Sequence, residues 1–174
     1  MVECQLKPGG IRNYRVTKQM SSVPREAFIS GTSRDLAYAD LQLQCAAGEA
    51  SRTMLTPIAL ALLIELADIQ ANDVVLDIAG GTGYSAAVLA GLASTVIALE
   101  DDEAFNEKAG AIWQDLGIDN AVAVAGAFTE RVRQNMSRAE RIELLLGHAE
   151  DLTEPDFISR DARPPRIRAE QPMT

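Results

Sequence analysis

Apolar residues recur in two patterns in the middle of this chain. Short runs of apolar, often β-branched residues occur at 74–78, 95–99 and 121–124. Runs of this length predict strands that are covered on both faces. The stretches between them, at about 84–92 and 103–116, have the length and composition of helices. This alternation of strands and helices predicts parallel βαβ units and therefore an α/β fold.

The apolar stretch from residue 58 to residue 69 carries the start signal of a helix. Thr56 is a preferred N-cap residue, and Pro57 follows it at the first helical position, where the fixed backbone angle of proline fits a helix. Because the stretch is apolar on nearly every side, we expect this helix to be well buried. Asp101 or Asp102 gives a similar start signal to the last of the predicted helices.

The N-terminal part of the chain is mixed and polar, and it predicts only short elements. Residues 11–20 have the spacing of a weakly amphipathic helix, and Pro24 opens a short helix at 23–28. Residues 36–44 partly alternate between apolar and polar, which favours an extended segment. We therefore expect a mostly helical N-terminal extension over residues 1–56.

The pattern weakens toward the C-terminus. Residues 142–146 predict a fourth parallel strand, although Glu143 interrupts its apolar run, and the sheet domain is expected over 57–158. Residues 159–174 combine Arg and Pro with few large apolar side chains, which predicts a disordered tail; the alternative is a basic arm that binds a partner. A sheet that ends on its fourth strand leaves a free edge, so we also expect self-association through that edge.

Composition and charge exclude several classes of partner. The chain has 16 Lys and Arg against 25 Asp and Glu, a net charge of −9 and a pI near 4.6, which argues against nucleic acid as a partner. No apolar run approaches the ~20 residues of a membrane span, so we expect no membrane contact. Without an apolar stretch at the N-terminus, the sequence predicts a cytoplasmic protein in which Cys4 and Cys45 are free thiols.

The strongest chemical signal is a glycine-rich segment between the first predicted strand and the helix that follows it. Asp77 ends the strand, and Gly80, Gly81 and Gly83 follow, so the backbone can approach a ligand closely. Glu100 ends the next strand, where a carboxylate can accept hydrogen bonds from both hydroxyls of a ribose. NAD, FAD and S-adenosyl-L-methionine sites all use such a loop, and a tight turn without a ligand is the remaining alternative.

Two details favour S-adenosyl-L-methionine among these ligands. Asp77 can bind an ammonium group, and the glycines follow an Asp-x-x-x-Gly-x-Gly spacing rather than Gly-x-Gly-x-x-Gly. An NAD-dependent oxidoreductase is the weaker alternative, because its glycine spacing and a catalytic Tyr-Lys or His-Asp arrangement are missing. A phosphate-binding loop with Gly-Lys-Ser or Gly-Lys-Thr is absent from the sequence, which excludes a P-loop hydrolase.

Three further motifs are more specific than the glycine loop. They are Val-Pro-Arg-Glu-Ala-Phe at 23–28, Ala-Tyr-Ala-Asp at 37–40 and Thr-Met-Leu-Thr-Pro at 53–57. With the loop, they resemble the protein-L-isoaspartate O-methyltransferase family over residues 1–128, and more faintly to residue 152. The resemblance implies a Rossmann-like class I methyltransferase sheet with a helical N-terminal extension. It also implies methyl transfer from S-adenosyl-L-methionine to a carboxylate of isoaspartyl residues in damaged proteins.

The resemblance also implies a set of site residues. The cofactor-binding residues would be Asp77, Ala79, Gly80, Gly81, Thr82, Gly83, Tyr84, Glu100, Gly126 and Ala127. The residues facing the substrate would be Thr53, Leu55, Thr56 and Pro57. No catalytic acid or base and no metal are expected, because a sulfonium donor and a carboxylate acceptor react once they are aligned and water is excluded. We therefore assign no catalytic role to His148, the single histidine.

The chain departs from the family pattern at four points. Ala79 replaces the leading glycine of the loop, Leu55 stands where the family has a substrate-binding serine, and Ala127 stands where it has an acidic residue near adenine. Thr53 and Thr56 offer substitute hydroxyls beside Leu55. Finally, too few residues follow Val74 for the family's seven-stranded sheet, so the sheet is expected to be incomplete and the activity impaired. The alternative function is a non-catalytic module that binds a nucleoside or a protein.

Overall fold

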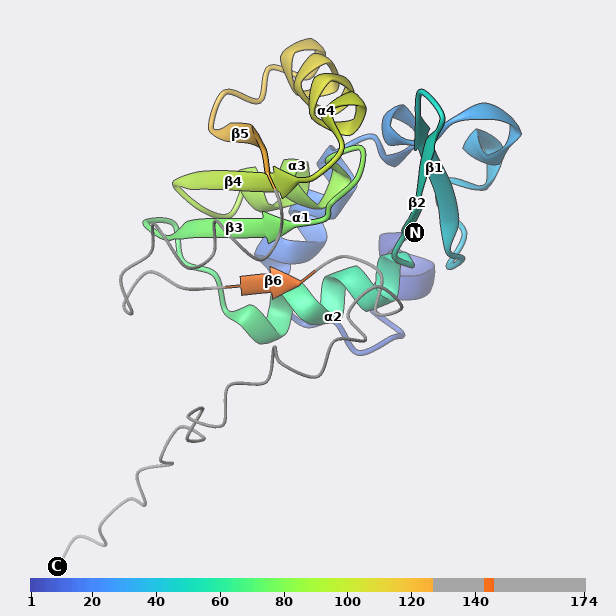
Figure 1. Cartoon of the computed structure of the whole chain (residues 1–174). Helices are drawn as coiled ribbons and strands as arrows, with labels where there is room; N and C mark the ends of the chain where they lie inside the picture. The colour runs from blue at the N-terminus through green and yellow to red at the C-terminus, as the bar shows by residue number, and fades with distance from the viewer. Residues whose placement is uncertain (127–142, 146–174) are drawn as a thin grey trace, which may run out of the picture.

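The computed structural model describes residues 1–126 and 143–145, and a parallel sheet lies at its centre (Figure 1). The strand order is β5-β4-β3-β6, and every neighbouring pair is parallel. The strands are β3 (Val74–Ile78), β4 (Thr95–Glu100), β5 (Ala121–Ala125) and β6 (Glu143–Leu145). The predicted α/β fold with about four parallel strands is therefore confirmed. Self-association through the edge at β6 stays a prediction.

Two helices connect the central strands, as the sequence predicted. Helix α3 (Tyr84–Ala90) joins β3 to β4, and helix α4 (Glu103–Asp115) joins β4 to β5. Asp102 is the N-cap of α4, and its Oδ1 accepts a hydrogen bond of 2.9 Å from the backbone N–H of Ala104. This bond satisfies one of the free N–H groups of the first turn, which is why the helix begins there.

Helix α2 (Pro57–Ala67) begins where the sequence predicted but is less buried than expected. The hydroxyl oxygen of Thr56 caps it by accepting from the N–H of Ala59 at 3.2 Å. Only one side of the helix enters the core, and Leu66 is 80% exposed among the described residues. The expectation of a well-buried helix is therefore wrong, because α2 packs against the edge strand β6 and the N-terminal helices rather than between other layers (Figure 1).

The N-terminal extension contains short helical elements, as predicted, and a hairpin that was not predicted. The helical elements are η1 (Val2–Leu6), α1 (Tyr14–Ser22), η2 (Arg25–Phe28) and η3 (Gly31–Leu36). Residues 36–44 are mostly not extended, which corrects that prediction. The strands lie later, at β1 (Leu43–Ala47) and β2 (Ala50–Met54), which form an antiparallel hairpin beside the ends of the sheet strands (Figure 1).

The extension and the sheet share one hydrophobic core. Leu6, Val16, Met20 and Phe28 from the extension belong to the same buried cluster as Val75 and Val96 of the sheet and Val88 and Leu89 of α3. The boundaries at 56 and 158 stay predictions, and the tail at 159–174, Ala127 and His148 lie outside the described residues. None of the helices in the described part of the chain has the length and apolar character needed to cross a bilayer.

Candidate functional site

The glycine loop lies at the edge of the sheet where β3 and β4 end, as expected for a ligand site in an α/β fold. The N–H of Ala79 donates to the carbonyl of Leu99 at 2.9 Å, which extends the pairing of β3 with β4 by one residue. Ala79 then adopts a φ of +57°, in the left-handed region. The methyl group of this residue does not prevent the turn, but it makes the backbone conformation costly.

Two glycines of the loop allow close approaches that a side chain would prevent. Gly81 has a φ of +57°, and a Cβ there would lie 3.2 Å from Sγ of Cys45 and 3.3 Å from Cβ of Arg52. Gly83 has a φ of +84°, and its Cβ would lie 2.6 Å from Cζ2 of Trp113. The loop is therefore covered by the β1–β2 hairpin at Gly81 and by α4 at Gly83.

Asp77 is fully buried at the end of β3. Its Oδ2 accepts a hydrogen bond of 2.6 Å from the hydroxyl of Ser85, whereas its Oδ1 has no partner among the described residues. Burial raises the pKa of Asp77 to about 7, and the hydrogen bond from Ser85 opposes that shift only in part. A buried carboxylate oxygen without a partner is costly and suits a cationic ligand group.

Glu100 ends β4 and points at the glycine loop. Its Oε2 accepts from the N–H of Gly81 at 3.1 Å, and its Oε1 lies 3.0 Å from Nη2 of Arg52. The residue is only 3% exposed, and burial raises its pKa above the ordinary value of a glutamate although the guanidinium of Arg52 acts in the opposite direction. The carboxylate that the sequence analysis expects to bind a ribose therefore lies against the glycine loop, and an arginine contacts it.

Thr82 and Tyr84 connect the loop to the N-terminal motif rather than facing open space. The hydroxyl of Thr82 donates to the carbonyl of Phe28 at 2.8 Å. The ring of Tyr84 packs edge-on against Phe28 with centroids 5.4 Å apart, and the guanidinium of Arg25 lies 4.8 Å above it. Arg25 in turn donates to the carbonyl of Leu55 at 2.6 Å. The motif at 23–28 therefore packs against the glycine loop through Phe28 and Arg25.

The residues predicted to face the substrate divide into two groups. Thr53 and Leu55 line a small cavity beside the glycine loop. Thr56 and Pro57 instead begin α2, and the hydroxyl of Thr56 is used as the helix cap. The hydroxyl oxygen Oγ1 of Thr53 accepts a hydrogen bond from Nε2 of Gln44 at 2.9 Å.

The remaining predicted cofactor residues lie at the end of β5. The N–H of Gly126 donates to the carbonyl of Glu100 at 3.1 Å, so this residue lies beside the predicted ribose site. Ala127 lies outside the described residues. Asp77, Glu100 and Gly126 therefore lie together at one edge of the sheet.

Sequence reasoning missed the residues that the hairpin brings to this site. The cavity between the hairpin and the loop has a volume of only about 20 Å³, and Cys45 and Arg52 line it. The contact is non-local, since Arg52 and Glu100 are separated by 48 positions. The apolar-polar-apolar alternation of Leu43, Gln44 and Cys45, followed by Gly48 at the turn, is the sequence signal that could have revealed the hairpin.

Comparison with known proteins decides the family. The model of the protein-L-isoaspartate(D-aspartate) O-methyltransferase family matches residues 1–136. The chain belongs to this family. It is 40% identical over 117 residues to a protein-L-isoaspartate O-methyltransferase of Rhodopseudomonas palustris, covering 67% of this chain and 52% of that protein. It is 37% identical over 121 residues to the enzyme of Roseiflexus, covering 70% of this chain and 54% of that protein.

A solved structure agrees with this assignment to the isoaspartate methyltransferase family. A protein-L-isoaspartate O-methyltransferase superposes with a TM-score of 0.64 at 31% identity, covering 70% of this chain and 39% of that one. The chain spans about half the length of the curated relatives described above. The resemblance seen in the motifs at 23–28, 37–40 and 53–57 is confirmed, and so is the Rossmann-like class I fold.

Proposed function

We propose that this chain binds S-adenosyl-L-methionine and directs its methyl group to a carboxylate of isoaspartyl residues in damaged cytoplasmic proteins. The observation that carries the proposal is the pair of buried carboxylates, Asp77 and Glu100, on either side of a loop without large side chains. One of them has an oxygen with no partner among the described residues, and the other already accepts a hydrogen bond from the loop. Family membership supports the same reaction.

The side chains at the loop match the chemistry of this cofactor. Oδ1 of Asp77, which has no partner among the described residues, suits the ammonium of the methionine part, and the oxygens of Glu100 suit the two ribose hydroxyls. The cavity of about 20 Å³ is far smaller than the several hundred Å³ of a typical ligand site. Because Cys45 and Arg52 of the β1–β2 hairpin lie close over Gly81, we expect binding to move the hairpin away from this glycine.

The chain's own residues bind and align the reactants. When bound, S-adenosyl-L-methionine would supply a methyl group on a positively charged sulfur. Transfer of this group to a carboxylate oxygen would break one carbon–sulfur bond, form one carbon–oxygen bond, and neutralise both charges without moving a proton. Asp77 holds the methionine part of the cofactor and Glu100 its ribose, and the hairpin excludes water when it closes. No general base is needed because the acceptor is already an anion.

A non-catalytic module that binds a nucleoside is the competing function. It is favoured by Leu55, which has no hydroxyl for the acceptor, and by the use of the Thr56 hydroxyl as a helix cap. Both functions require the cofactor site. They differ in whether a methyl acceptor binds beside it and is methylated. A test must therefore measure cofactor binding and methyl transfer separately.

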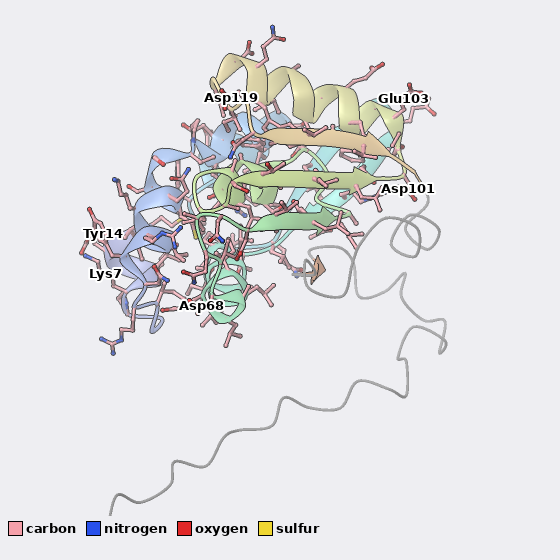
Figure 2. The ribbon with its side chains drawn as sticks, turned by 90° about the vertical axis from the view of Figure 1, so that its left-hand side faces the viewer. Lys7, Tyr14, Asp68, Asp101, Glu103 and Asp119 are labelled. Atoms are coloured by element: carbon pink, nitrogen blue, oxygen red, sulfur yellow. The ribbon has the colours of Figure 1, made fainter. Side chains whose placement is uncertain are left out.

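The first measurement is calorimetric titration of the chain with S-adenosylhomocysteine. We expect binding, and we expect Glu100→Gln to weaken it by about tenfold or more, because the hydroxyls lose a charged acceptor. Glu103→Gln is the matched control: this exposed glutamate lies on the same side of the molecule as Asp101, close to the end of β4 (Figure 2). Its substitution should leave the affinity unchanged. Absence of binding to the unmodified chain would refute both candidate functions.

The second measurement is transfer of a labelled methyl group to a peptide that contains one isoaspartyl residue. The same peptide with an ordinary aspartyl residue is the control for the acceptor. Labelling of the isoaspartyl peptide alone supports the proposed function. Binding of S-adenosylhomocysteine without any transfer would leave the nucleoside-binding module.

A further inference from the structure

Arg52 of β2 lies across the predicted ribose site. Its Nη2 is 3.0 Å from Oε1 of Glu100 and 2.7 Å from Oδ1 of Asp101, and its guanidinium lies 5.3 Å from the ring centroid of Phe105. The side chain is 23% exposed, and its Cβ packs against the space left by Gly81. Arg52 is thus a partly buried cation that two carboxylates and one aromatic ring hold in place.

The contact with Arg52 competes with the proposed cofactor. Oε2 of Glu100 accepts from Gly81, and Oε1 accepts from Arg52 and from the N–H of Asp101 at 3.2 Å. Two ribose hydroxyls need these same acceptor oxygens. A carboxylate accepts about four hydrogen bonds and Glu100 already accepts three, so both hydroxyls can bind it once Arg52 leaves. Asp101 then remains as a partner for the guanidinium at the edge of the site.

The negative charge of the site shows why binding of an anionic acceptor would need the guanidinium of Arg52. An isoaspartyl acceptor is an anion, and the carboxylates of Asp77, Glu100 and Asp101 repel it. Arg52 is the one cation among the described residues that line the cavity. Arg25 lies nearby, but it is fully buried behind Tyr84 and donates to a backbone carbonyl.

Arg52 also keeps its charge under the conditions of the reaction. Burial opposes the charged form, but the carboxylates of Glu100 and Asp101 outweigh burial and raise the pKa of Arg52 above its usual value. The planar guanidinium has five N–H donors, so it can bind one carboxylate oxygen of an acceptor while it keeps a bond to Asp101. The second oxygen of the acceptor stays free to receive the methyl group.

We propose that Arg52 binds the carboxylate of the methyl acceptor, and that it becomes available only after the cofactor has displaced it from Glu100. This inference rests on the proposed function and adds an acceptor-binding residue and an order of binding to it. In the free protein, Arg52 and Glu100 hold each other and the hairpin lies closed on Gly81. Cofactor binding exchanges the partner of Glu100 and presents the guanidinium to the acceptor.

Two binding measurements on the full chain test this proposal without relying on turnover. S-adenosylhomocysteine affinity is measured by calorimetry, and the affinity of a fluorescent isoaspartyl peptide by anisotropy, with and without saturating S-adenosylhomocysteine. For the unmodified chain, we expect the peptide to bind about tenfold more tightly when S-adenosylhomocysteine is present, the effect of one charge-assisted hydrogen bond. A peptide that carries an amide in place of the isoaspartyl carboxylate should show no such gain.

The variant Arg52→Gln should change the two affinities in opposite directions. The affinity for S-adenosylhomocysteine should rise by about threefold or more, because the guanidinium that competes for Glu100 is gone. The affinity for the isoaspartyl peptide should fall by about tenfold. A hairpin that is merely disturbed would not strengthen one ligand and weaken the other. Arg52→Lys keeps the charge without the planar fork, so its peptide affinity should lie between those of the unmodified chain and Arg52→Gln.

The matched control is Arg12→Gln, which removes the same charge from an exposed position. Arg12 lies between Lys7 and Tyr14, which Figure 2 places on the opposite side of the molecule from Asp101. This variant should keep both affinities. Unchanged affinities in Arg52→Gln, or peptide binding that does not depend on S-adenosylhomocysteine, would overturn the role of Arg52 alone. Failure of the unmodified chain to bind S-adenosylhomocysteine would overturn the proposed function, and this proposal with it.

Discussion

Substitution of Asp77 by asparagine should change how the stability of the chain depends on pH. The pKa of Asp77 is about 7 in the folded protein, against an ordinary value of 3.8, because the carboxyl is fully buried. Below about pH 4, Asp77 is protonated in both the folded and the unfolded chain and contributes no slope. Between that pH and about 7, the folded chain retains a proton that the unfolded chain has released, so the free energy of unfolding falls as pH rises.

The slope gives the size of the effect. One retained proton lowers the free energy of unfolding by about 1.4 kcal/mol per pH unit. Between pH 5 and pH 8, the unmodified chain should therefore lose about 3 kcal/mol relative to Asp77→Asn, which has no carboxyl to ionise at this position. Glu100, whose pKa is also raised, adds a slope of the same sign to both proteins, and its charge is one of the smaller causes of the raised pKa of Asp77.

The assay is urea unfolding of both proteins at pH 5, 6, 7 and 8. Asp119→Asn is the control, because Asp119 is an exposed aspartate on the surface of the same molecule (Figure 2). Its curve of stability against pH should run parallel to that of the unmodified chain. If the Asp77→Asn curve also runs parallel, Asp77 is ionised in the folded protein at low pH and the argument from its burial fails.

Substitutions at three other positions should change stability through the glycine loop and the N-cap of α2. Gly83→Ala should destabilise the fold by about 3 kcal/mol, since the new methyl would lie 2.6 Å from Trp113 at a φ of +84°; a melting temperature close to that of the unmodified chain would contradict this. Ala79→Gly should raise the free energy of unfolding by roughly 0.5 kcal/mol in urea melts, because relief of the left-handed backbone exceeds the added chain entropy. Thr56→Ala should cost about 1 kcal/mol in the same melts through loss of the α2 cap, and Thr56→Ser should restore it.

Local signals in the sequence predicted the elements of the sheet. The apolar runs gave β3, β4 and β5 nearly to the residue, and the caps Thr56 and Asp102 placed the starts of α2 and α4. These features depend on neighbours only a few positions apart, so the sequence contains them directly. The burial of α2 was mispredicted because a helix that is apolar on all sides is buried only where other segments pack against it, and its sequence does not specify those segments.

The candidate site was predictable only in part, for a related reason. Asp77 and Glu100 end adjacent strands of one parallel sheet, so topology alone brings them to the same edge. Arg52 comes from a hairpin whose position depends on how the N-terminal extension packs over the loop. No local pattern specifies that packing, and the contact between Arg52 and Glu100 therefore escaped sequence reasoning.

The sequence by itself determined the α/β class, the order of the central elements, the family and the two carboxylates of the site. Only the tertiary structure decided that Ala79 adopts a left-handed backbone, that one oxygen of Asp77 has no partner among the described residues, and that Arg52 covers Glu100. The physical reason is range: hydrophobic period and capping act within a few residues, whereas burial and ion pairing depend on segments that only folding brings together.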